Sequence, residues 1–185
     1  MKAGVLALQG DFREHARMLA ECGATPVLVR TAEELASVEC LAIPGGESTT
    51  IGKLARIHGL VEPIRRRASE GMPILGTCAG MIVLARRVRG GAPLLSLLDV
   101  EVRRNAYGRQ VDSFEADVEV REVGPVRAVF IRAPQVTGVG PEVDVLAEHD
   151  GQPVVVQEGR ILAASFHPEI AEDPRLHQRL LKLAG

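Results

Sequence analysis

The sequence contains no tryptophan, one tyrosine and four phenylalanines, so aromatic residues make up only 3% of its 185 residues. Proteins that stack nucleic-acid bases do so on aromatic side chains, and this composition argues against such a surface. The 22 lysines and arginines are offset by 24 aspartates and glutamates, for a net charge of −2. The one basic cluster, residues 65–67, fits a solvated helix face. The sequence therefore predicts no nucleic-acid partner.

Long apolar runs are also missing. No stretch approaches the roughly 18 apolar residues of a membrane-spanning helix, and the apolar segment 3–8 is too short for the core of a signal peptide. The three cysteines have no close paired spacing, which favours neither a disulfide framework nor a zinc cluster. We expect a cytoplasmic protein that contacts no membrane and has no metal site and no cofactor.

The first half of the chain alternates strand and helix patterns. Apolar runs predict strands at residues 3–8, 26–30, 40–43 and 73–77, and apolar residues at helical spacing predict helices at 11–21, 32–36, 49–58, 61–69 and 80–87. Alternation with short connections is typical of parallel strands joined by right-handed crossovers.

Beyond Gly90 the pattern becomes rich in β-strands. Strands are predicted at 100–103, 113–120, 126–132, 143–148, 154–157 and 161–166, and a final helix at 174–183. A chain of this length suits one domain. The sequence therefore predicts a single α/β domain over residues 1–185, a three-layer sandwich whose central sheet is mostly parallel, with antiparallel additions in the C-terminal half.

Cys78 lies where the predicted strand 73–77 meets the predicted helix 80–87. A side chain at such a strand-to-helix turn projects into a cleft, and nearby glycines let a substrate approach closely. Because the thiolate is the nucleophile, a helix N-terminus and a neighbouring imidazole would both activate it. We predict that Cys78 is a nucleophile, whereas Cys22 and Cys40 are expected to be buried as small apolar residues.

The segment His167-Pro168-Glu169 offers the base that such a nucleophile needs. A residue before proline favours extended geometry, so the side chains of His167 and Glu169 project to the same side. Glu169 can then orient the imidazole, as the third member of a triad does. A structural histidine is the alternative, which the combination with Cys78 makes less favourable. The other histidines are expected at the surface: His15, His58, His149 and His177.

The glycine pair in segment 44–48 follows the predicted strand 40–43. Carboxyl ends of parallel strands meet at one edge of a sheet, so this turn, the turn at 9–11 and the nucleophile turn are expected to lie together. The amides of Gly46 and Ala79 would then stabilise an oxyanion. Two alternatives stay open: a phosphate-binding loop, although the usual spacing is absent, and a simple helix cap at Ser48.

Together these residues resemble the class I, triad-type glutamine amidotransferase family. The matching motifs cover essentially the whole chain, at residues 4–10, 44–50, 76–80, 104–110, 112–115, 130–134 and 167–169. The motifs at 47–50, 104–110 and 130–134 are similar to the branch of that family that supplies ammonia for pyridoxal 5'-phosphate synthesis.

The resemblance implies hydrolysis of L-glutamine to L-glutamate and ammonia through a glutamyl thioester on Cys78, with His167 as acid and base and Glu169 orienting it. It also implies a set of glutamine contacts: Gly46, Glu47, Ser48, Arg104, Ile131 and Arg132. Without the resemblance, the two arginines would be interpreted as charges on surface strands. The implied ammonia acceptor is a separate, barrel-shaped synthase subunit that combines ammonia with a pentose phosphate and a triose phosphate.

Two other functions remain open from the residues alone. An intracellular cysteine peptidase on a similar α/β scaffold would also use a cysteine at such a turn, although the glutamate two residues after His167 speaks against it. A noncatalytic, flavodoxin-like module would bury Cys78 and hold a phosphate at Gly45 and Gly46.

Overall fold

The computed structural model describes residues 1–104 and 113–185. Its largest sheet has seven strands in the order β10-β11-β12-β4-β3-β1-β2. These strands are β1 (Lys2–Leu6), β2 (Thr25–Val29), β3 (Cys40–Ile43), β4 (Ile74–Thr77), β10 (Asp144–His149), β11 (Gln152–Glu158) and β12 (Ile161–Ala164). The five strands from β12 to β2 are parallel, and β11 and β10 continue the sheet antiparallel.

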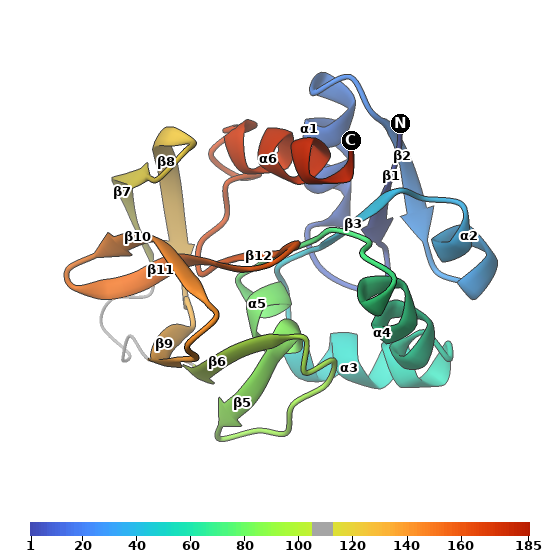
Figure 1. Ribbon diagram of the computed structural model, residues 1–185, viewed down its shortest axis with the longest axis horizontal. Helices are drawn as coiled ribbons and strands as arrows, with labels where there is room; N and C mark the ends of the chain where they lie inside the picture. Colours follow the sequence, from blue (N-terminus) through green and yellow to red (C-terminus); the bar gives the residue numbers. More distant parts are fainter. Residues whose placement is uncertain (105–112) are drawn as a thin grey trace.

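Helices cover both faces of this sheet, and the three layers are visible in Figure 1. One face carries α1 (Phe12–Glu21) and α6 (Arg175–Ala184), and the other carries α3 (Ser48–Ile57), α4 (Val61–Ser69) and α5 (Ala79–Leu84). The short α2 (Ala32–Ala36) lies beside β2. The predicted three-layer α/β architecture with a mostly parallel sheet is therefore confirmed. No helix in the described parts of the chain is long and apolar enough to cross a bilayer.

The prediction of a helix over 80–87 is wrong at its end. The helix α5 stops at Leu84, and β5 (Ala85–Arg89) follows directly. Two arginines of β5 form ion pairs with acidic residues of the neighbouring strand: Arg87 contacts Asp99 at 2.7 Å and Arg89 contacts Glu101 at 2.7 Å. Local apolar spacing does not reveal these cross-strand partners.

The prediction that all later strands extend the central sheet is also only partly right. β6 (Leu98–Arg103) pairs with β5 and with β9 (Gln135–Val139), a strand that the sequence pattern did not predict, in a separate three-stranded sheet. β7 (Ser113–Val120) and β8 (Gly124–Ile131) form a hairpin of their own. Within residues 1–104 and 113–185, only β10 and β11 extend the central sheet in the antiparallel direction, and β12 is parallel to β4.

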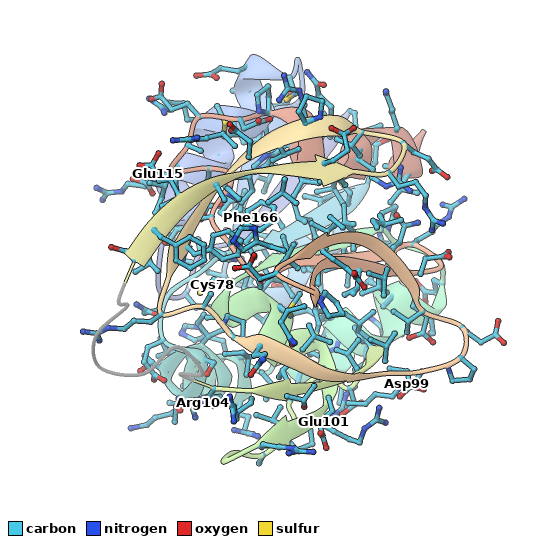
Figure 2. The ribbon with its side chains drawn as sticks, turned by 90° about the vertical axis from the view of Figure 1, so that its left-hand side faces the viewer. Cys78, Asp99, Glu101, Arg104, Glu115 and Phe166 are labelled. Atoms are coloured by element: carbon cyan, nitrogen blue, oxygen red, sulfur yellow. The ribbon has the colours of Figure 1, made fainter. Side chains whose placement is uncertain are left out.

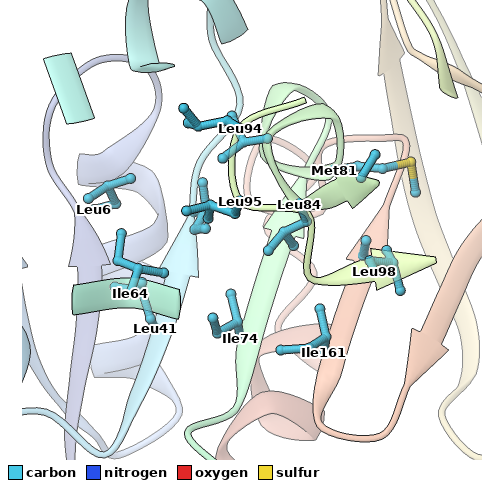
Figure 3. Close-up of a cluster of buried hydrophobic side chains, with 14 of the residues drawn as sticks. Leu6, Leu41, Ile64, Ile74, Met81, Leu84, Leu94, Leu95, Leu98 and Ile161 are labelled. Carbon is cyan, nitrogen blue, oxygen red and sulfur yellow. The ribbon is translucent and has the colours of Figure 1, made fainter. Parts of the chain in front are cut away.

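Two buried hydrophobic clusters hold these layers together, one on each face of the sheet. Figure 3 shows the first, where Leu41 and Ile74 from the sheet meet Ile64 of α4 and Leu84 of α5. The second includes Phe166, which follows β12, and side chains of α6. Burying each such large apolar side chain contributes roughly 1.5–3 kcal/mol, so the ends of the central strands are held in fixed positions.

Candidate active site

Neighbouring parallel strands bring Cys78 and His167 together. Thr77, the last residue of β4, pairs with Ala164, the last residue of β12. The amide of Cys78 donates to the carbonyl oxygen of Ala164 at 2.8 Å, and the amide of His167 donates to that of Val129 in β8 at 2.8 Å. Both residues therefore leave the sheet at its carboxyl edge, where ligand crevices form in such folds.

The backbone of Cys78 is strained in the way a nucleophile turn requires. Its φ is 49° and its ψ is −105°, in a region that residues other than glycine rarely adopt and that is typical of active sites. The next turn of chain packs closely on β3, because a Cβ at Gly80 would collide with the carbonyl oxygen of Ile43. Cys78 is buried, with 7% of the residue exposed, and its Sγ lies 3.8 Å from the carbonyl oxygen of Ile131.

His167 and Glu169 form a buried pair. Nδ1 of His167 lies 2.7 Å from Oε1 of Glu169, and it lies 3.4 Å from Oδ2 of Asp11. Burial by itself lowers the pKa of His167, but interactions with Cys78 and Glu169 outweigh burial and raise it to about 10. Burial raises the pKa of Glu169, and the nearby imidazoles of His15 and His167 outweigh burial and bring it well below its usual range. The arrangement favours an imidazolium beside an ionised carboxylate.

A cavity of about 430 Å³ opens in front of Cys78, within the range of small-molecule sites. Figure 2 labels two of the residues around the cavity, Cys78 and Arg104. The cavity is lined by Asp11, Gly46, Glu47, Ser48, Cys78, Ala79, Ile82, Arg104, Ile131, Arg132, His167 and Ile170. The lining includes every residue that the sequence analysis assigned to the site except Glu169, which lies behind His167 and is 1% exposed.

Glu47 organises one wall of this cavity. Its carboxylate accepts hydrogen bonds from the amides of Thr49 and Thr50 at 3.0 and 2.7 Å, and Arg104 donates to it at 3.0 Å. The backbone hydrogen bonds outweigh partial burial and lower the pKa of Glu47 to about 2. Glu47 is thus the N-cap of α3, which corrects the alternative that Ser48 caps this helix. A fixed negative charge here also disfavours the phosphate-binding alternative.

The three predicted turns do meet at this edge of the sheet. The amide of Asp11 donates to the carbonyl oxygen of Gly45 at 3.2 Å, and the amide of Glu47 donates to the side chain of Gln9 at 2.7 Å. A Cβ at Gly45 would collide with the imidazole of His167. The loop around Gly45 is therefore held against the imidazole on one side and against the turn after β1 on the other.

The prediction that His15 and His177 lie at the surface is wrong, since both are 0% exposed. They lie behind Glu169, with Nε2 of His15 3.4 Å from its Oε2. The signal was available for His15, which falls three residues after Phe12 and four before Leu19 on the predicted apolar face of α1.

The remaining predictions of where side chains lie are partly confirmed. His58 is exposed as expected. Cys40 is buried as expected, and burial raises its pKa to about 12, whereas Cys22 is only partly buried. Arg104 and Arg132 line the cavity rather than an outer strand surface. Apart from Arg104, the motif at 104–110 lies outside the described residues, and so does the first residue of the motif at 112–115.

Asp11, His167 and Glu169 also have the spacing of metal ligands, with one ligand atom each within 4.8 Å of the others. Nδ1 of His167 is already hydrogen-bonded to Glu169 at 2.7 Å, however. A metal ion would have to replace that bond, so the cluster fits proton chemistry better than metal binding.

Comparisons with known proteins agree with this geometry. A model of the SNO glutamine amidotransferase family matches residues 5–183. A relative from Frankia casuarinae, named pyridoxal 5'-phosphate synthase subunit PdxT, is 57% identical over 96% of this chain and 92% of its own. The protein of that name from Thermus thermophilus is 55% identical over 98% and 97%. A crystal structure of a glutamine amidotransferase matches with a TM-score of 0.95 at 52% identity, over 99% of this chain and 98% of that one.

Proposed function

This chain belongs to the SNO glutamine amidotransferase family, and we propose that it is the glutaminase that supplies ammonia for pyridoxal 5'-phosphate (vitamin B6) synthesis. It hydrolyses L-glutamine to L-glutamate and ammonia, and a separate synthase subunit consumes the ammonia. The observation that carries the proposal is the cavity shared by Cys78 and His167, in a chain 57% identical to a protein named as a subunit of that synthase.

The first half of the reaction breaks the amide bond. The thiolate of Cys78 attacks the side-chain carboxamide carbon of glutamine, which forms a carbon–sulfur bond and a tetrahedral oxyanion. His167 donates the proton on Nε2 to the amide nitrogen, because its Nδ1 is engaged by Glu169. The carbon–nitrogen bond then breaks, ammonia leaves, and a glutamyl thioester remains on Cys78.

The second half releases glutamate. His167, now neutral, takes a proton from a water molecule whose oxygen attacks the thioester. The carbon–sulfur bond breaks and restores the thiolate beside the imidazolium. We propose that the amides of Gly46 and Ala79, both at the cavity wall, stabilise the two oxyanions, since one lost donor of this kind typically costs about a hundredfold to a thousandfold in rate.

Charged residues around the cavity suit an amino-acid substrate that bears both an ammonium and a carboxylate. We propose that Glu47, Arg104 and Arg132 contact these two groups of glutamine, together with Ser48 and Ile131. Glu47 is well suited to an ammonium because its lowered pKa keeps it ionised. Arg104 is held by Glu47 at 3.0 Å, so both side chains are preorganised.

We propose that residues 1–185 act as one domain and that the partner is a barrel-shaped synthase subunit. Two hydrophobic clusters on opposite faces of one sheet support the single domain. The described cavity accounts for glutamine hydrolysis, and we propose that the partner binds the sugar phosphates. We place the reaction in the cytoplasm, because a catalytic thiol is preserved in a reducing compartment.

The test is ammonia production from glutamine, with and without the synthase subunit. We expect low activity alone and higher activity in the complex. Cys78→Ala abolishes turnover in both, whereas the matched control Cys22→Ala keeps it. Equal rates with and without the synthase would refute activation by the partner, and turnover by Cys78→Ala would refute the nucleophile.

The same preparation separates the two other functions. Hydrolysis of peptides without glutamine turnover would favour the cysteine peptidase. Absence of any turnover, with no reaction of Cys78 toward electrophiles, would favour the noncatalytic module.

A further inference from the structure

Two buried histidines continue the hydrogen-bonded pair of His167 and Glu169 into the interior. Nε2 of His15 lies 3.4 Å from Oε2 of Glu169 and 3.0 Å from Oγ1 of Thr77. Nδ1 of His15 lies 2.8 Å from Nε2 of His177. The chain of contacts thus runs from α6 through α1 to the cavity, and none of the proposed catalytic steps uses His15 or His177.

Two buried side-chain atoms in this series of contacts have no hydrogen bond among the described residues: Oε2 of Glu169 and Nδ1 of His177. A buried carboxylate oxygen needs a facing donor, because an unpaired buried charge is costly. His15 is in position to be that donor, with a small rotation toward Oε2.

The two atoms without a hydrogen bond also indicate which ring nitrogens of His15 and His177 carry the protons. If Nε2 of His15 carries its proton, it faces Thr77 and Glu169 as a donor, and Nδ1 accepts from Nε2–H of His177. Nδ1 of His177 is then an unpaired acceptor. The opposite arrangement leaves a buried N–H of His177 without an acceptor and turns a lone pair of His15 toward a carboxylate, and orphaned buried N–H groups are rarer than orphaned acceptors.

We propose that His15 is a positioning residue for the glutaminase reaction, which donates from Nε2 to Glu169 and is itself held in that tautomer by His177. The inference rests on the proposed function. With a donor on each side, both oxygens of Glu169 are fixed, so the carboxylate stays ionised and aimed at Nδ1 of His167. His15 acts through Glu169 and does not touch the substrate cavity.

The charges around Glu169 agree with this role. A hydrogen bond from His15 is among the interactions that lower the pKa of Glu169, and burial lowers the pKa of His177 to about 3 and so keeps that ring neutral. The other titratable groups facing the pair are Asp11, before α1, and Cys78, after β4. Asp11 lies on the cavity side of His167, whereas His15 and His177 lie on the interior side of Glu169.

The test compares His15→Leu, His15→Gln and His15→Asn in the complex with the synthase subunit. The amide nitrogen of glutamine can occupy the place of Nε2, whereas that of asparagine reaches only the place of Nδ1. We expect His15→Leu to lower kcat by roughly tenfold to a hundredfold with little change in KM, by analogy with outer-shell residues that orient metal-ligating histidines. His15→Gln should recover most of the activity and His15→Asn should not.

A purely structural role would not move the pH profile. Because Glu169 helps to raise the pKa of His167, a misplaced carboxylate shifts the alkaline limb of kcat/KM to lower pH in His15→Leu, and His15→Gln shifts it back. The matched control is Leu180→Ala, a buried substitution on α6 that should lower thermal stability without moving the limb.

Each outcome decides the inference. Wild-type kcat and pH profile in His15→Leu would overturn it, and so would equal activities of the glutamine and asparagine variants, which remain informative if the leucine variant fails to fold. Nitrogen-15 NMR of His177 gives a second check, since protonation at Nδ1 rather than Nε2 would contradict the proposed proton order. Absence of turnover in the wild-type complex would instead refute the proposed function.

Discussion

Replacing Glu169 by glutamine is the most informative perturbation of the proposed triad. The change keeps the size of the side chain but removes the charge that faces Nδ1 of His167 at 2.7 Å. A glutamate accepts hydrogen bonds on both oxygens, whereas a glutamine accepts on one only. With His167 on one side and His15 on the other, Glu169→Gln cannot satisfy both donors.

The structure sets the size of the effect. A hydrogen bond to a charged group contributes about 1.5–3 kcal/mol, and each 1.36 kcal/mol lost in the transition state lowers the rate about tenfold. Loss of this one interaction therefore predicts a fall in kcat of roughly tenfold to a hundredfold. If the amide nitrogen faces His167 and selects the wrong tautomer, the fall approaches the ~10⁴-fold seen for the corresponding change in a serine-protease triad.

The assay is steady-state ammonia release in the complex with the synthase subunit, with circular dichroism to show that the variant is folded. Asp173→Asn is the matched control, because Asp173 is another buried carboxylate, whose oxygens bind the amides of Arg127 and Arg175 rather than His167. We expect the control to keep kcat within a few-fold of wild type. A folded Glu169→Gln variant with wild-type kcat would refute the role of Glu169.

Three further predictions follow from single contacts. Gly45→Ala places a Cβ against the imidazole of His167 and should lower kcat by about a hundredfold, the effect of a ~1 Å misplacement, in a protein that circular dichroism shows to be folded; unchanged kcat would contradict the packing. Arg104→Ala should raise the KM for glutamine about tenfold, with little change in Tm because its partly exposed pair with Glu47 contributes at most ~1 kcal/mol; an unchanged KM would remove Arg104 from the site. His177 has a pKa lowered from 6.5 to about 3 in the folded state, so between these pH values the unfolded state binds one more proton, and the free energy of unfolding falls as pH drops from about 6.5 to 3. In urea unfolding, the free energy of unfolding of His177→Phe should depend less on pH than that of the wild type. An equal pH dependence would contradict a neutral His177.

Local pattern was enough to predict most of the elements of the central sheet. The predicted bounds of β3, α2, α4 and β7 agree with the structure, because an apolar run or a helical spacing ends there at a turn. The bounds fail where a distant partner decides the structure. Strand β5 forms where its backbone pairs with β6, and Arg87 and Arg89 meet Asp99 and Glu101 across that pairing. Strand β9 pairs with the other edge of β6.

The same division applies to the site. The rule that parallel strands end at one edge placed Cys78 and His167 in one crevice, because it depends only on strand order and direction. It gave no information about His15 and His177, whose buried state depends on each other's position 162 residues apart in the chain. A polar residue on an apolar helix face indicates such a partner but does not identify it.

The central claim is that the thiol of Cys78 is the group that attacks glutamine beside His167. It is tested most directly by treating the protein with a diazo-ketone analogue of glutamine and locating the adduct by mass spectrometry of proteolytic peptides. The account predicts one adduct, on Cys78, that forms in step with the loss of glutaminase activity and is prevented by excess glutamine. Loss of activity with Cys78 unmodified, or modification of Cys22 or Cys40 in its place, would contradict it.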